Sequence, residues 1–69
     1  QEILRQLRKA LGLSQKDLAG LMHITQPAVS KLERQTDMQL STLAGIVQAM
    51  GGTLEITARF PDREPVRLA

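Results

Sequence analysis

The sequence predicts a mainly α fold in which four short helices are followed by a C-terminal β-strand or hairpin that pairs in a dimer. Three observations support it. Apolar residues recur at helical spacing through residues 3–50. Helix-starting and helix-ending residues separate this stretch into segments. After Gly51-Gly52 the apolar period changes to two. We therefore expect a helical domain at residues 1–50 and a β extension, used for dimerisation, at residues 51–69.

The first two helices are predicted at residues 3–11 and 15–22. Apolar residues at helical spacing define the first one: Ile3, Leu4, Leu7 and Leu11. Gly12 follows as a residue that readily ends a helix. Ser14 then stands at an N-cap with Asp17 three residues later, which is the spacing of a capping box. These signals place a short break between two amphipathic helices.

The third helix is predicted to run from Gln26 to about Arg34 after a very short break. Thr25 is its N-cap, and Pro27 is tolerated in the first turn because the N–H groups there have no intrahelical partner. Val29 and Leu32 are its expected core residues. His23, at the break, is expected to be structural, since His enters the left-handed region more easily than a β-branched residue does.

The fourth helix is predicted at residues 40–50, after a polar loop at 35–39. Its apolar face is formed by Leu40, Leu43, Ala44, Ile46, Val47 and Met50. Gly51-Gly52 ends it, and Gly51 suits a left-handed backbone conformation.

The segment "TLEITARF" then alternates as a strand with one apolar face, formed by Leu54, Ile56, Ala58 and Phe60. After the turn "PDRE", the segment "PVRL" can return as a second strand. A two-stranded hairpin alone is marginal in water. We expect the four apolar residues to pack across an intermolecular sheet in a symmetric dimer. The alternative is that the hairpin folds back on its own helices.

Composition excludes several classes of function. The 69 residues form one small domain with no Cys and one His, so neither a disulfide framework nor a metal cluster is expected. Phe60 is the only aromatic residue, which argues against a base-stacking platform. The sequence shows no paired carboxylates, activated nucleophile or phosphate loop. We expect no enzyme, no cofactor, no membrane span and a cytoplasmic protein.

Charge is distributed unevenly along the chain. Residues 1–35 carry six basic and three acidic residues, whereas residues 36–69 carry three basic and four acidic ones. A positive first half suits a polyanionic partner, although a merely solvated face remains the alternative.

Two helices joined by a tight turn, the second with polar residues at its front, describe a helix-turn-helix, whose second helix enters the major groove of DNA.

The run "LSQKDLAGLMHITQPAVSKLER" resembles the helix-turn-helix family of phage repressors and bacterial Xre-type regulators. The matching features are Gln15, Leu18-Ala19, the "ITQ" start of the third helix, Val29-Ser30 and Leu32-Glu33. The resemblance implies that the second helix abuts the DNA backbone and that the third reads bases. It also implies a structural ion pair between Arg8 and Glu33, for which the alternative is that both are solvated.

Carried over by position, the resemblance assigns DNA-binding roles to Gln15, Thr25, Gln26, Ala28, Lys31 and Arg34. Gln26 would read adenine through its amide, and Ala28 would meet a thymine methyl group. Gln15 and Thr25 would anchor the backbone, Lys31 would reach guanine or phosphate, and Arg34 would lie near the backbone. Pro27 departs from the polar residue common at its position.

The ending "MGGTLEITARF" is similar to that of HigA-type and HipB-type antitoxins, a branch of this family. That resemblance implies a homodimer, a palindromic operator in double-stranded DNA through which the protein represses its own operon, and a bound protein toxin. Two alternatives remain open. One is a stand-alone Xre-type regulator, and the other is a toxin-neutralising interaction protein with weak DNA binding.

Overall fold

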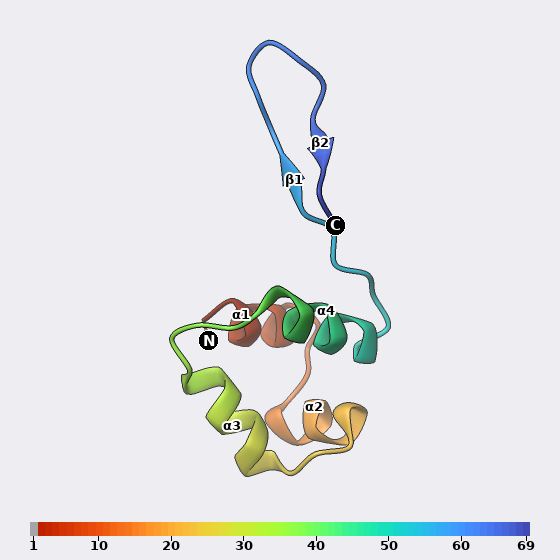
Figure 1. Ribbon diagram of the computed structural model, residues 1–69. Coiled ribbons are helices and arrows are strands. Elements are labelled where there is room, and N and C mark those ends of the chain that lie inside the picture. Colours follow the sequence, from red (N-terminus) through yellow and green to blue (C-terminus); the bar gives the residue numbers. More distant parts are fainter. Residues whose placement is uncertain (1) are drawn as a thin grey trace.

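The structure, a computed structural model, describes residues 2–69; residue 1, where the predicted helical domain begins, lies outside the described residues. Within residues 2–69 the chain forms four helices and a two-stranded hairpin: α1 (Glu2–Ala10), α2 (Gln15–Met22), α3 (Gln26–Arg34), α4 (Leu40–Ala49), β1 (Thr57–Ala58) and β2 (Val66–Arg67). Figure 1 shows α2 and α3 on one side of the helical body and the hairpin projecting from the opposite side. The predicted fold class is confirmed.

The helices surround a small aliphatic core to which each of them contributes. Its buried residues are Leu4 of α1, Leu18 and Ala19 of α2, Val29 of α3 and Ile46 of α4. Burying a side chain such as Leu or Val contributes about 1.5–3 kcal/mol. Val29 therefore fixes the rear of α3 against the other helices, while the front of α3 stays at the surface.

Local capping signals set the bounds of α2. The Oγ of Ser14 accepts a hydrogen bond from the backbone N–H of Asp17 at 3.0 Å, and Asp17 Oδ2 accepts from the N–H of Ser14 at 2.9 Å. The hydrogen bond from the Ser14 backbone lowers the pKa of Asp17. At the other end, His23 adopts the left-handed conformation with φ 58° and ψ 39°. The capping box and the structural role of His23 are as the sequence predicted.

A tight turn then leads into α3. The backbone N–H of Ala28 donates to Thr25 Oγ1 at 3.2 Å, so Thr25 is the N-cap of α3. Ser14 and Thr25 thus fix where α2 and α3 begin, because each satisfies a backbone N–H of the first turn.

The C-terminal segment forms an antiparallel hairpin within the chain, with Thr57 opposite Arg67 and Ala58 opposite Val66. Ile56 extends the pairing, since its N–H donates to the Ala69 carbonyl at 2.8 Å and its carbonyl accepts from Leu68 at 2.7 Å. The pairing is shorter than the predicted strand. Pro61 and Pro65 are placed between the strands, and proline has no N–H for a ladder.

The hairpin does not fold back on the helices but projects away from them (Figure 1). Along the segment that leads into β1 and through it, Leu54, Ile56 and Ala58 are half-buried and alternate with exposed residues, as the sequence predicted, whereas Phe60 is exposed. The pairing seen here lies within the chain, whereas the packing of the apolar face on a second copy stays a prediction.

Candidate nucleic-acid interface

The N-terminal ends of α2 and α3 meet at a shallow pocket of about 380 Å³. Five residues line it: Gln15, Gln26, Pro27, Ser30 and Arg34. The sequence assigns Gln15, Gln26 and Arg34 to DNA binding, and the fold brings these three residues together at one polar surface. We call this surface, defined by its five lining residues, the recognition pocket.

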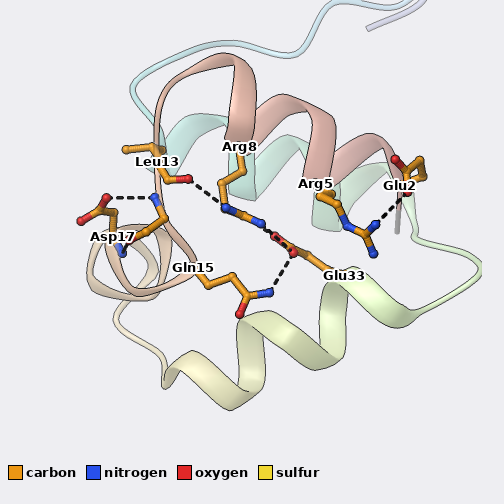
Figure 2. Close-up of polar contacts among 8 residues, drawn as sticks. Glu2, Arg5, Arg8, Leu13, Gln15, Asp17 and Glu33 are labelled. Carbon is orange, nitrogen blue, oxygen red and sulfur yellow. Dashed lines mark hydrogen bonds and ion pairs between the residues drawn. The ribbon is translucent and has the colours of Figure 1, made fainter.

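Arg8 of α1 and Glu33 of α3 form the ion pair that the resemblance implied (Figure 2). Arg8 Nε donates to Glu33 Oε2 at 2.6 Å, and Arg8 Nη2 donates to Oε1 at 3.2 Å. Arg8 Nη1 also donates to the Leu13 carbonyl at 2.9 Å. The guanidinium thus holds both the carboxylate and the α1–α2 connection.

The carboxylate of Glu33 is ionised although its side chain is only 3% exposed. The hydrogen bond from Arg8 lowers the pKa of Glu33 below its ordinary value of 4.5 and outweighs burial, which acts in the opposite direction. A hydrogen bond from Gln15 lowers this pKa further. Glu33 in turn raises the pKa of Arg8.

Gln15 contributes a contact that the sequence did not predict. Its Nε2 donates to Glu33 Oε1 at 3.0 Å, as Figure 2 shows. One carboxylate therefore binds both the arginine of α1 and the glutamine at the start of α2. The contact joins residues 18 positions apart, and no local spacing in the sequence predicts it.

Ser30 was also absent from the predicted site. Arg34 Nη1 donates to Ser30 Oγ at 2.7 Å across one helical turn, and both residues line the recognition pocket. The i,i+4 spacing of Ser30 and Arg34 was the signal available in the sequence. The contact holds the guanidinium beside the pocket.

The remaining predicted residues lie outside the lining of this pocket. Thr25 is exposed and caps α3, and Ala28 is half-buried behind it. Lys31 is exposed on α3. Ala28 and Lys31 thus lie on α3 and Thr25 immediately precedes it, but none of the three lines the pocket.

The predicted dimerisation residues lie on the hairpin, away from α2 and α3 (Figure 1). Leu54, Ile56 and Ala58 are half-buried, whereas Phe60 is 48% exposed. Leu68, on the returning strand, is 65% exposed. The hairpin therefore displays apolar surface that a partner would cover.

Amides, a guanidinium and helix N-termini provide hydrogen-bond donors for phosphates and for base edges. Among residues 2–69 there is no group of three or more His, Cys, Asp or Glu residues arranged to hold a metal ion. In that same part of the chain, no helix is long and apolar enough to cross a membrane. The donor set matches the grooves and backbone of double-stranded nucleic acid.

Known proteins with similar sequences point in the same direction. A family model described as "Helix-turn-helix" matches residues 4–56. A candidate antitoxin HigA2 of Mycobacterium tuberculosis is 44% identical over 61 residues, and a candidate antitoxin HigA3 of the same organism is 47% identical over 60 residues. These matches cover 86% and 83% of this chain, which spans 60% and 55% of the two relatives.

Solved structures agree with the sequence matches. A HigA antitoxin structure, described as showing induced DNA bending by unique dimerization, matches with a TM-score of 0.80 at 44% identity, over 94% of this chain and 88% of that one. A DNA-bound antitoxin HigA3 matches with a TM-score of 0.74 at 43% identity, over 96% of this chain and 87% of that one. The likeness therefore includes the hairpin as well as the helices.

Proposed function

Because the chain belongs to the helix-turn-helix family, we propose that it is a sequence-specific DNA-binding repressor, the antitoxin of a toxin–antitoxin pair, which represses its own operon as a homodimer. The observation that carries the proposal is the recognition pocket, where Gln15 and Gln26, the first residues of α2 and α3, lie together with Arg34, the last residue of α3. The solved relative bound to DNA supports it.

In this proposal α3 enters the major groove, which at about 12 Å is wide enough for a helix. The amide of Gln26 pairs with adenine, and Ala28 meets a thymine methyl group. Lys31 reaches guanine or phosphate. Gln15, Thr25 and Arg34 bind the backbone on either side, so they position α3 without reading sequence.

The hairpin supplies the dimer. Its residues Leu54, Ile56, Ala58 and Phe60 pack against the same residues of a second copy, and the unique dimerization described for a HigA relative supports an assembly of this kind. A symmetric dimer places two copies of α3 about 34 Å apart, one helical turn of DNA, and so matches a palindromic operator.

A protein toxin is the second proposed partner, supported by the relatives named as HigA antitoxins. A stand-alone regulator is the alternative. It is favoured by 42% identity over 50 residues, 71% of this chain and 51% of the relative, to an uncharacterized HTH-type transcriptional regulator of Haemophilus influenzae. The proposal includes no catalytic role, and a repressor acts in the bacterial cytoplasm, where its operator lies.

Selection from a random duplex library, followed by footprinting at physiological salt, tests DNA binding. We expect the selected sequence to be a palindrome with two protected half-sites about 34 Å apart. No protected palindrome would leave only a toxin-neutralising interaction protein with weak DNA binding. Coexpression with the neighbouring reading frame then separates an antitoxin from a stand-alone regulator, because only an antitoxin rescues growth and copurifies with its toxin.

A further inference from the structure

We propose that Glu33 is a positioning residue for DNA binding, because its carboxylate fixes the orientation of the Gln15 amide at the N-terminus of α2. The inference rests on the proposed function, in which Gln15 binds the DNA backbone. It goes beyond the ion pair with Arg8, since it gives a buried fold residue a direct effect on the binding surface.

The geometry links three helices at one carboxylate. Glu33 Oε1 accepts hydrogen bonds from Gln15 Nε2 at 3.0 Å and from Arg8 Nη2 at 3.2 Å, and Oε2 accepts from Arg8 Nε at 2.6 Å. Glu33 is 4% exposed, whereas Gln15 also lines the recognition pocket. The Gln15 side chain is thus held by a buried carboxylate and also contributes to the surface of the recognition pocket.

An ionised carboxylate accepts hydrogen bonds and donates none. The two ends of a glutamine amide have nearly the same shape, so chemistry rather than packing decides which end points inward. Glu33 therefore requires the NH₂ group of Gln15 to point toward it. This orientation directs the Gln15 carbonyl oxygen away from Glu33, and the nitrogen keeps a second hydrogen for a phosphate oxygen.

Holding the amide in place also reduces the conformational entropy that Gln15 loses when DNA binds. A free glutamine side chain has several rotamers, and a contact that fixes it before binding raises affinity. A glutamine at position 33 would present an NH₂ group as well as an oxygen. It would allow the Gln15 amide to turn over, so that donor and acceptor exchange places.

The charge of Glu33 and its hydrogen bond to Gln15 predict opposite effects of Glu33→Gln on the affinity for DNA. Replacing Glu by Gln removes a negative charge, and a polyanion is then attracted more strongly. If charge alone mattered, Glu33→Gln would bind DNA more tightly. If the carboxylate orients Gln15, Glu33→Gln binds less tightly, so the sign of the change discriminates between the two.

The experiment measures affinity for the duplex that the wild-type protein selects from the library. The variants are Glu33→Gln, Gln15→Ala and the double variant, with Glu2→Gln as the matched control. Glu2 is also paired with an arginine, Arg5, at 3.5 Å, but it is exposed and remote from Gln15. We expect Glu33→Gln to bind about tenfold more weakly, and Glu2→Gln to bind equally or more tightly.

In the Gln15→Ala background, Glu33→Gln should change the affinity by less than about twofold, since the group it orients is gone. A Glu33→Gln variant that binds as tightly as wild type, or an equal loss in both backgrounds, overturns the inference while the DNA-binding function stands. Failure of the wild-type protein to select any duplex overturns the proposed function instead.

A second measurement needs no variant of Glu33 and therefore does not depend on its folding. NMR relaxation of the side-chain NH₂ groups in the wild-type protein compares Gln15 with the exposed Gln6 and Gln39. We expect the Gln15 amide to be markedly more rigid than the two controls. Equal mobility in all three would overturn the inference.

Discussion

Arg8 and Glu33 join α1 to α3 through a bidentate ion pair whose carboxylate side chain is 3% exposed and whose guanidinium side chain is 11% exposed. The same carboxylate accepts from Gln15 at the start of α2. In a small domain with an aliphatic core, this polar cluster ties the helices that carry the recognition pocket to the body of the fold.

Removing one partner of this pair should destabilise the protein strongly. Glu33→Ala leaves the guanidinium of Arg8 buried without its carboxylate, and we expect the free energy of unfolding to fall by about 3–5 kcal/mol. Urea denaturation followed by far-UV circular dichroism measures it. The exposed control Glu2→Ala should stay within about 0.5 kcal/mol of wild type, and a Glu33→Ala change that small would refute the prediction.

The pair also predicts how stability depends on pH. The hydrogen bond from Arg8 lowers the pKa of Glu33 in the folded state below its ordinary value of 4.5. Its contribution is therefore fully present above the unfolded pKa and is lost as pH falls through the folded pKa. Between about pH 5 and pH 2, wild type should lose more stability than Glu33→Gln.

Thermal unfolding of both proteins across that pH range provides the measurement. The pKa of Asp17 is also lowered, but Asp17 is present in both proteins, so its effect cancels in the difference. Parallel pH profiles for the two proteins would show that Glu33 contributes nothing to acid unfolding.

The helices were predictable because their ends depend on neighbouring residues. Ser14 with Asp17, and Thr25 with the Ala28 N–H, act over three residues, and the observed bounds of α2 and α3 equal the predicted ones. The hydrogen bond of Gln15 to Glu33 depends on how α2 and α3 pack, which local spacing does not encode.

The hairpin also has a property that local spacing in the sequence does not encode, namely the length over which its strands pair. The alternation of "TLEITARF" correctly predicted that Leu54, Ile56 and Ala58 share a half-buried face, but Phe60, predicted on the same face, is exposed. Strand length depends on the partner segment. Within the described residues, pairing joins Thr57 and Ala58 to Arg67 and Val66, and Pro65, just before β2, has no N–H with which to extend the ladder toward the turn. Alternation fixes the face of a strand and leaves its paired length open.

Gln26 should determine sequence preference. In the proposed interface the amide of Gln26 pairs with adenine, so we expect Gln26→Ala to lose about 1–3 kcal/mol on the selected duplex with no change on a scrambled duplex. Fluorescence anisotropy titrations on both duplexes provide the comparison. Gln39→Ala, an exposed glutamine at the N-cap of α4, is the control. Equal loss on both duplexes would make Gln26 a backbone contact.

Arg34 should act on affinity without regard to sequence. In the proposed interface Arg34 contacts a phosphate, so we expect Arg34→Ala to weaken binding to every duplex and to make the slope of log K against log salt shallower by about 1. Titrations over a range of salt concentrations give the slope. Arg63→Ala, in the exposed turn of the hairpin, should leave the slope unchanged. A slope unaltered by Arg34→Ala would remove Arg34 from the interface.

The hairpin should control assembly through its apolar face. Ile56 is half-buried on that face, whereas its neighbour Thr57 is exposed on the other face of β1. An Asp at position 56 places a charge where we expect two copies to pack, and burying an unpaired charge is costly. Ile56→Asp should therefore be monomeric at concentrations where wild type and the control Thr57→Asp are dimeric, as sedimentation equilibrium would show.

The same pair of variants connects assembly to DNA binding. Ile56→Asp should lose affinity for the full palindrome, because two linked copies of α3 bind successive grooves with a higher effective concentration than one. Its affinity for an isolated half-site should equal that of wild type, since α2 and α3, whose residues line the recognition pocket, lie on the opposite side of the helical body from the hairpin (Figure 1). A dimeric Ile56→Asp protein would place the dimer interface elsewhere. A monomeric wild-type protein would refute the proposed dimer.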